Sequence, residues 1–339
     1  MDVYATERTG TGTVPELAAE DGCGTWRGGV ERQRNSGEVA TLRITYLTVL
    51  ATHPDKPSLL RTLLILGRVS NLPTVWSNCL AGWLLSDGKD WSRFGMLGAG
   101  ASLLYIGGMY LNDACDVRFD TQHRNARPIP AGHISARLVW ILSAVLLLTG
   151  IALLALLGQT TALAALGLVA CIVAYDLVHK KTAFAPILMA GCRFLLYVVA
   201  AAATNHWIRN QVLLCAGALA LFIVALSFIA RKEAHGVRPN LLVLPLFIAP
   251  LVTGHLGLTP QNRATLGLIG LAYVAWVIWS LSHMIKGGPP AIGRTVSALL
   301  AGIVLVDMLA VQGGGGLMPL AFLVLFVTAL ILQRVIPAT

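Results

Sequence analysis

Acidic residues are scarce in most of this 339-residue chain. Charged residues make up 12% of the sequence, whereas soluble domains carry about a quarter. Of the 16 Asp and Glu residues, eight lie in residues 1–60 and eight in the remainder. Because 56% of the residues are hydrophobic, this shortage of charge excludes an ordinary soluble domain and indicates a membrane protein.

Other signatures are also missing. The six cysteines show no CxxC spacing, so neither a disulfide framework nor a zinc site is indicated. No nucleic-acid-binding motif accompanies the net charge of +9, and we expect no nucleic-acid partner. Residues 1–60 lack a basic stretch followed by an apolar core, so we expect a disordered cytoplasmic extension there and no signal peptide. Residues 61–339 are expected to form one transmembrane domain.

Ten apolar runs follow residue 60, each near the roughly 20 residues that cross a bilayer as a helix. They lie at about 64–85, 94–111, 138–158, 160–178, 183–204, 211–230, 240–258, 264–285, 295–311 and 317–334. Only residues 312–316 separate the last two runs, so nine spans plus a peripheral piece is an alternative. The pattern predicts an all-α, polytopic membrane bundle of nine to ten helices.

Loop charges predict the orientation of this bundle. If the N-terminus is cytoplasmic, the loops on its side carry 11 Lys and Arg residues and the opposite loops carry four. This bias follows the positive-inside rule. We therefore expect a multi-pass protein of a bacterial inner membrane, with the loop after the second run in the cytoplasm.

That loop begins with the most distinctive motif of the chain. Asn112 and Asp113 are followed by Asp116 and Asp120, and the spacing i, i+3, i+7 places the three carboxylates on one face of a helix. Clustered anions repel one another unless a cation lies among them. Oxygen ligands with room for phosphate oxygens suit Mg²⁺, so the motif predicts a magnesium site; a solvated loop end is the alternative.

Basic residues at the same membrane face are candidates for binding an anion. Arg127 opens the turn Arg-Pro-Ile-Pro-Ala-Gly, and Lys180 and Lys181 end the fourth run. We expect Arg127 to pair with the aspartates or with phosphate and the lysines to bind a diphosphate; the alternative is that these bases only fix the topology. Arg193 lies about ten residues inside the fifth run, where a charge costs a few kcal/mol unless it faces a cavity or an acid. Asp307, inside the ninth run, needs an interior partner that the sequence does not name.

The motif N-D-x-x-D-x-x-x-D after the second run, followed by R-P-I-P-A-G, resembles the UbiA superfamily of intramembrane prenyltransferases. The first run contains Arg68-Val69-Ser70-Asn71-Leu72-Pro73-Thr74. This segment and a set of later residues are similar to the EboC-type, UbiA-like branch: Tyr175-Asp176, Lys180, Pro186, Met189 and Cys192-Arg193. The resemblance covers roughly residues 62–310.

The resemblance implies a helical bundle whose central cavity binds an isoprenyl diphosphate through Mg²⁺ and transfers its prenyl group to a lipophilic, commonly aromatic, acceptor. By position, the implied Mg²⁺ site and catalytic residues are Asn112, Asp113, Asp116 and Asp120. The implied diphosphate and cavity residues are Asn71, Arg127, Tyr175, Lys180, Arg193, Arg231 and Lys232. Glu233 is a candidate for a second metal site.

One segment departs from the family pattern. A second acidic motif is expected after the sixth run, but the sequence there reads Arg231-Lys232-Glu233-Ala234-His235, with one acid and two bases. Either one Mg²⁺ suffices and the bases replace a second metal, or the diphosphate chemistry is altered. The alternative to an enzyme is therefore a catalytically degenerate protein that binds or moves a lipid-linked metabolite. A CDP-alcohol phosphotransferase is disfavoured because its D-G-x-x-A-R block is missing.

Overall fold

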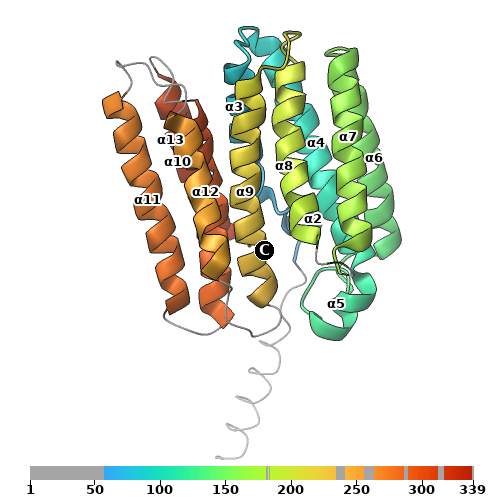
Figure 1. Ribbon diagram of the computed structural model, residues 1–339. Helices are drawn as coiled ribbons and strands as arrows, with labels where there is room; N and C mark the ends of the chain where they lie inside the picture. Colours follow the sequence, from blue (N-terminus) through green and yellow to red (C-terminus); the bar gives the residue numbers. More distant parts are fainter. Residues whose placement is uncertain are drawn as a thin grey trace, which may run out of the picture. The chain divides into compact units, whose positions relative to one another are not determined.

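The computed structural model describes residues 57–180, 182, 184–233, 241–255, 263–285, 289–311 and 317–337. Within these ranges the chain is helical and contains no β-strand (Figure 1), which confirms the predicted all-α class. Eight helices are long and apolar enough to cross a membrane. They are α4 (Trp91–Cys115), α6 (Ala136–Ala155), α7 (Gln159–Val178), α8 (Ala185–Ala202), α9 (Asn210–Glu233), α11 (Arg263–Ile285), α12 (Pro289–Ala310) and α13 (Met318–Val335). Residues 1–56 of the predicted N-terminal extension lie outside the described residues.

The first apolar run is not one continuous helix. It divides into α2 (Leu59–Leu66), a 3₁₀ turn η1 (Val69–Asn71) and α3 (Leu72–Leu85). Gly67 ends α2, and Arg68 adopts left-handed backbone geometry with φ of 42°. Pro73 stands at the start of α3, the position in a helix that tolerates the missing N–H. Arg68 therefore lies in the break between α2 and η1 and not within a helix.

The seventh run is broken in a similar way. Its first part is the 3₁₀ helix η2 (Leu241–Ile248), which contains Pro245, and its second part is α10 (Ala249–His255). A proline inside a helix removes one backbone donor and prevents regular α-helical packing of the preceding turn. All ten predicted runs are thus helical in the part of the chain that the structure describes, but two of them are interrupted.

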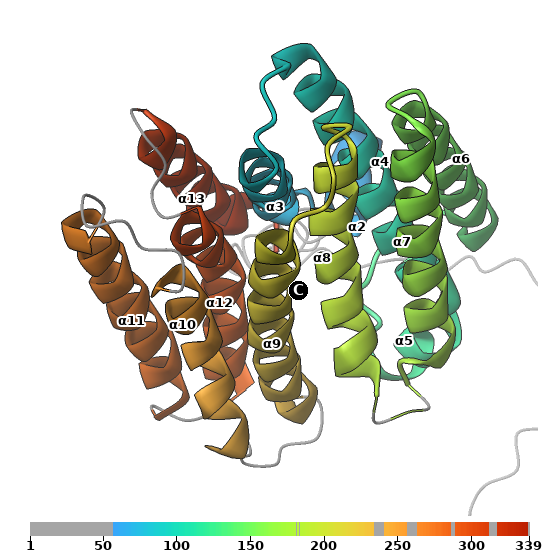
Figure 2. The ribbon, with the colours of Figure 1, turned by 45° about the horizontal axis from the view of Figure 1, so that its top comes forward.

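The helix α3 lies between α12 and α13 on one side and α4 and α8 on the other (Figure 2), and it contributes to two apolar cores. In one core, Val75, Cys79 and Trp83 pack with α4, α6, α7 and α8. In the other, Leu80 and Leu85 pack with α8, α9, α11 and α12. Because its apolar side chains are shared between two cores, the polar side chains of α3 also lie in the interior of the bundle.

Glycine allows α4 and α6 to approach closely. A Cβ atom on Gly100 would lie 2.7 Å from Leu154, and one on Gly150 would lie 2.7 Å from Leu104. Small residues at such contacts are typical of helix packing in membranes. This close contact between α4 and α6 helps to position the Asp113–Asp120 segment, which begins at the C-terminal end of α4.

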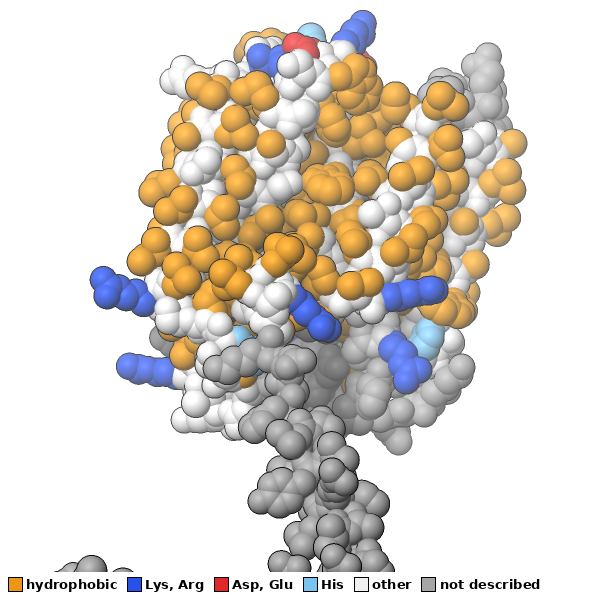
Figure 3. Space-filling model, turned by 180° about the vertical axis from the view of Figure 1, so that it is seen from behind, with side chains coloured by type: hydrophobic (Ala, Val, Ile, Leu, Met, Phe, Trp, Pro, Cys, Tyr) orange, Lys and Arg blue, Asp and Glu red, His pale blue; other side chains and the backbone are white. Residues whose placement is uncertain are grey.

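The surface of the bundle matches a lipid environment. Hydrophobic side chains cover the middle of the molecule, and charged side chains gather toward its two ends (Figure 3). Leu148, Leu163 and Leu271 each expose more than 60% of their surface, although an apolar patch of this extent is rare on soluble monomers. With eight helices of spanning length, the chain is an integral membrane protein.

Candidate functional site

The aspartates of the predicted metal motif lie where α4 passes into the short helix α5 (Val117–His123), at the end of the bundle that we call the α5 end. The backbone N–H groups of Asp116 and Asp120 bond to the carbonyls four residues earlier, at 3.0 and 2.9 Å. Helical hydrogen bonding therefore continues through the junction, which keeps Asp113, Asp116 and Asp120 in the register that their spacing requires. All three side chains are buried in protein, Asp120 with 1% of its surface exposed.

Two arginines from different parts of the chain hold Asp113. Arg127 Nη1 lies 2.7 Å from Asp113 Oδ1 and 3.6 Å from Asp120 Oδ2. Arg68 Nη2 lies 3.2 Å from the same Asp113 oxygen and 3.4 Å from Asn112 Oδ1. The left-handed backbone at Arg68 thus directs its guanidinium toward the motif. We did not predict this role for Arg68. The signal available in the sequence was an arginine within an apolar run.

Asp116 is held by the residues that follow α7. Lys180 Nζ lies 2.6 Å from Asp116 Oδ1, and His179 Nε2 lies 3.4 Å from Oδ2. Burial acts to raise the pKa of Asp116, but the hydrogen bonds from His179 and Lys180 outweigh it and lower that pKa. For His179, burial favours a lower pKa, but the bond to Asp116 prevails and raises it.

Aromatic rings fix the positions of these two cations. Lys180 Nζ lies 3.9 Å from the centre of the Phe119 ring in α5, a cation–π arrangement. The ring of His179 stacks on Tyr175, with centroids 5.0 Å apart. A separate contact comes from the end of α9, where Arg231 donates to the backbone carbonyl of Thr182 at 3.0 Å. This hydrogen bond joins α9 to the connection that follows Lys180.

Asp176 joins the site from α7. Its Oδ1 accepts a 2.9 Å hydrogen bond from Asn112 Nδ2, and only 5% of its surface is exposed. Tyr175 is among the predicted site residues, whereas Asp176 is not. The available signal was the rarity of acids inside apolar runs.

Arg193 lies apart from the aspartates. Its guanidinium donates to Asn78 Oδ1 at 2.7 Å and to Thr74 Oγ1 at 3.0 Å, both on α3. Position 193 is eight residues into α8, about 12 Å along the helix at 1.5 Å per residue. Within the described structure Arg193 forms no ion pair with Asp113, Asp116 or Asp120, so the geometry does not place it with Arg127 and Lys180.

Asp307 has the interior partners that its position required. Asn78 Nδ2 donates to Asp307 Oδ2 at 2.7 Å, and Tyr197 donates to Oδ1 at 2.5 Å. Ser77 donates to Oδ2 as well. Asp307 is fully buried. Asn78 therefore connects Arg193 to Asp307 and links α3, α8 and α12 through one polar network.

The remaining predicted residues are only partly described. Asn71 is buried at the end of η1. Lys232 and Glu233 end α9, but their side chains lie outside the described residues, so the predicted second metal position cannot be described in structural terms.

The donor set at the α5 end fits a hard divalent cation. Asp120 Oδ1 and Asp176 Oδ2 are buried oxygens with no hydrogen-bond partner in the described structure, and carboxylate oxygens are the ligands that Mg²⁺ prefers. Within the described ranges no three acidic, His or Cys side chains converge on one point as a preformed metal site. Asp113 and Asp116 instead point at basic side chains.

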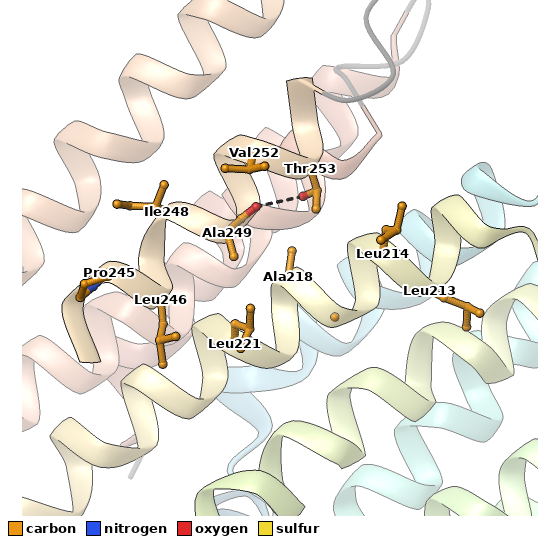
Figure 4. Close-up of a pocket in the computed structure, with 11 residues that line it drawn as sticks. Leu213, Leu214, Ala218, Leu221, Pro245, Leu246, Ile248, Ala249, Val252 and Thr253 are labelled. Carbon is orange, nitrogen blue, oxygen red and sulfur yellow. Dashed lines mark hydrogen bonds between the residues drawn. The ribbon is translucent and has the colours of Figure 1, made fainter. Parts of the chain in front are cut away.

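An apolar groove elsewhere on the bundle is separate from this site. It runs between α9 and the broken helix η2–α10 (Figure 4). Leucines of α9 and side chains around Pro245 line it. Among its described lining residues the one polar side chain is Thr253, which donates to the carbonyl of Ala249 at 3.2 Å. None of its lining residues belongs to the predicted site.

These observations define a class: an integral membrane bundle with a buried acidic site, paired with basic side chains, at one end. The model of the UbiA prenyltransferase family matches residues 71–305. The chain belongs to this family, and the match includes the Asp113–Asp120 segment. The comparisons do not bear on the EboC-type branch, which stays a prediction.

Curated relatives match a shorter part. The chain is 32% identical over 125 residues to 4-hydroxybenzoate octaprenyltransferase of Stutzerimonas stutzeri, which covers 36% of this chain and 40% of the relative. It is 30% identical over 122 residues to the enzyme of the same name from Pseudomonas aeruginosa, which covers 35% and 40%. The matched part thus spans about two fifths of each relative.

The fold also matches a solved structure. A structure of digeranylgeranylglyceryl phosphate synthase has a TM-score of 0.53 and 18% sequence identity, covering 75% of this chain and 98% of that chain. At this identity the likeness supports the fold alone.

Proposed function

We propose that this protein is an intramembrane prenyltransferase that moves an isoprenyl group from an isoprenyl diphosphate to a lipophilic acceptor. The observation that carries the proposal is the cluster of Asp113, Asp116 and Asp120 with four basic side chains at one end of a membrane bundle. Buried ion pairs contribute little net stability, and acids within membrane proteins are rare and mark functional sites. A cluster this dense is therefore best explained by binding of a charged substrate.

Asp113, Asp116 and Asp120, together with Asn112, would hold Mg²⁺. When bound, Mg²⁺ stabilises the negative charge that forms on the departing diphosphate as the C–O bond breaks. The unpaired Asp120 Oδ1 is available to it without any change of partner. Asp113 and Asp116 would become available once their basic partners turn to the phosphate oxygens.

Arg68, Arg127, His179 and Lys180 would receive the diphosphate. Each now lies against a carboxylate, and arginine can bind phosphate oxygens bidentately. Fixed positive charges next to the leaving group stabilise the transition state more than the ground state, because negative charge accumulates there during ionisation. The chain therefore exchanges internal ion pairs for pairs with the substrate.

The apolar bundle supports the second half of the reaction. A prenyl chain partitions into apolar surroundings, and exclusion of water protects the allylic cation until an acceptor attacks it. Since 4-hydroxybenzoate octaprenyltransferases are among the relatives, we propose an aromatic acceptor of the hydroxybenzoate type. Lipid contacts on the exposed leucines keep the protein in the membrane.

A second candidate is a protein that binds a lipid-linked diphosphate without turnover. The segment Arg231–Glu233 favours this candidate, because it contains a single acid and therefore offers fewer carboxylates for a second metal ion than the family pattern does. Both candidates require the same binding site, so binding alone does not separate them.

The decisive test is a transfer assay in membranes. Radiolabelled farnesyl and geranylgeranyl diphosphate are supplied with Mg²⁺ and 4-hydroxybenzoate, and prenylated product is measured for the wild type, Asp113→Asn and Asp116→Asn. Asp87→Asn is the matched control, because Asp87 is exposed and pairs with Arg209 instead. We expect product from the wild type and the control and at least a hundredfold loss in the two site variants. Binding of label without product would favour the second candidate.

We further propose that the protein lies in a bacterial inner membrane with the N-terminus and the α5 end in the cytoplasm, as the loop charges predict. Arg124 is exposed next to α5, so Arg124→Cys should react with a membrane-impermeant maleimide in inverted vesicles but not in intact cells. Because Cys23 lies in the expected cytoplasmic extension, the substitution is made in a chain whose six native cysteines are replaced, and that cysteine-free chain is the control. Labelling in intact cells would reverse the orientation.

A further inference from the structure

Asp176 carries chemistry that the metal motif alone does not explain. It lies in the last turn of α7, and its Oδ1 accepts the hydrogen bond from Asn112 Nδ2 at 2.9 Å. Asn112 directly precedes Asp113, so this bond joins the α7 carboxylate to the metal motif of α4.

The second oxygen of Asp176 is unsatisfied. Asp176 Oδ2 is buried and has no hydrogen-bond partner in the described structure, although 95% of the residue is shielded from solvent. An unpaired buried carboxylate oxygen is costly. An asparagine at this position would accept the same bond from Asn112 without a charge, so the contact with Asn112 does not account for a carboxylate.

The neighbouring basic side chains are already engaged. Arg68 and Arg127 point at Asp113, and His179 and Lys180 point at Asp116. Among the residues that the structure describes, no basic side chain pairs with Asp176 Oδ2, so a cation bound from outside the chain would supply the missing charge. A divalent cation at the adjoining motif is the nearest source that the site chemistry offers.

The supply of acids leads to the same conclusion. Beyond residue 60 the chain has eight acids, and four of them, Asp113, Asp116, Asp120 and Asp176, lie at this site. Mg²⁺ is commonly bound by one or two carboxylates plus substrate phosphates, so four carboxylates suffice for two ions. Asp176 thereby makes up for the acids that are missing from the Arg231–Glu233 segment.

We propose that Asp176 is a metal ligand, which binds through Oδ2 a divalent cation shared with the diphosphate of the substrate. This inference rests on the proposed function, because it uses the same Mg²⁺–diphosphate site. It adds a ligand from α7, a helix outside both acidic segments of the family pattern.

Metal binding tests this inference without turnover. Mn²⁺ replaces Mg²⁺, inorganic pyrophosphate replaces the substrate headgroup, and free Mn²⁺ is measured by electron paramagnetic resonance with the purified full-length protein in detergent. Asp176→Asn keeps an oxygen for the Asn112 bond and removes the charge. We expect Mn²⁺ affinity to fall about tenfold or more, with Asp87→Asn unchanged. If Asp176→Asn does not fold, Asp176→Ser, which is smaller and polar, replaces it with the same expected loss.

The outcomes separate the two proposals. Wild-type affinity in the Asp176 variant, with a loss in Asp113→Asn, overturns the role of Asp176 and leaves the proposed function intact. A wild-type protein that binds no Mn²⁺ with pyrophosphate present overturns both.

Discussion

Asn78 donates a hydrogen bond to Asp307 at 2.7 Å from one end of its amide, while the other end accepts one from Arg193 at 2.7 Å. A single neutral side chain thus separates the half-buried Arg193 from the fully buried Asp307. Neither charge has to be exposed to lipid, because each is satisfied by hydrogen bonds within the bundle. The network connects the helices α3, α8 and α12.

Asp307→Ala should destabilise the bundle strongly. The substitution leaves the donors of Ser77, Asn78 and Tyr197 without their acceptor and leaves Arg193 without a balancing charge. Removing one partner of a buried charged network costs about 3–5 kcal/mol. The melting temperature in detergent should fall accordingly, fall less for Asp307→Asn, and change little for the exposed Asp87→Ala. An Asp307→Ala protein as stable as the wild type would refute the network's structural role.

Arg127→Ala should impair the proposed reaction. Arg127 is the arginine nearest to Asp113 and also approaches Asp120, so its loss removes positive charge where the diphosphate would depart. We expect kcat/KM for the isoprenyl diphosphate to fall about a hundredfold. Arg124→Ala, three residues away and exposed, is the control and should retain activity. Equal activity of the two variants would remove Arg127 from the site.

The pairing of His179 with Asp116 should make stability depend on pH. The pKa of His179 is raised in the folded state, so its contribution is complete below the ordinary histidine pKa of about 6.5 and is lost as pH rises through the raised value. Asp116, whose pKa is lowered, stays ionised throughout this range. In EDTA, the wild type should therefore lose thermal stability relative to His179→Gln as pH rises above about 6.5. Parallel curves for the two proteins would show that the pair adds no stability.

Much of the fold is predictable because a membrane imposes one simple requirement. Each of the ten apolar runs is helical over its described residues, since a backbone in lipid must satisfy its own hydrogen bonds. The break at Gly67 and Arg68 was not predicted, because hydropathy reports how apolar a segment is and not whether its helix is continuous. The structure shows what the break does: it allows the Arg68 guanidinium to reach Asp113.

The site was predictable to the extent that it lies in one segment. Asp113, Asp116 and Asp120 are joined by helical spacing, which the sequence displays directly. Asp176 and Arg193 depend on which helices pack together, and periodicity does not contain that information. For this reason the sequence indicates no role for Asp176. The contacts of Arg193 with α3 are likewise visible only in the structure, and its place among the diphosphate and cavity residues stays a prediction.

The central claim is that the aspartates at the α4–α5 junction bind an isoprenyl diphosphate through a divalent cation. Equilibrium binding of radiolabelled farnesyl diphosphate to the purified protein, with Mg²⁺ or with EDTA, tests it most directly in the wild type and in Asp116→Asn. The account predicts Mg²⁺-dependent binding to the wild type that weakens at least tenfold in EDTA and in the variant. Binding of equal strength in all these conditions would contradict it.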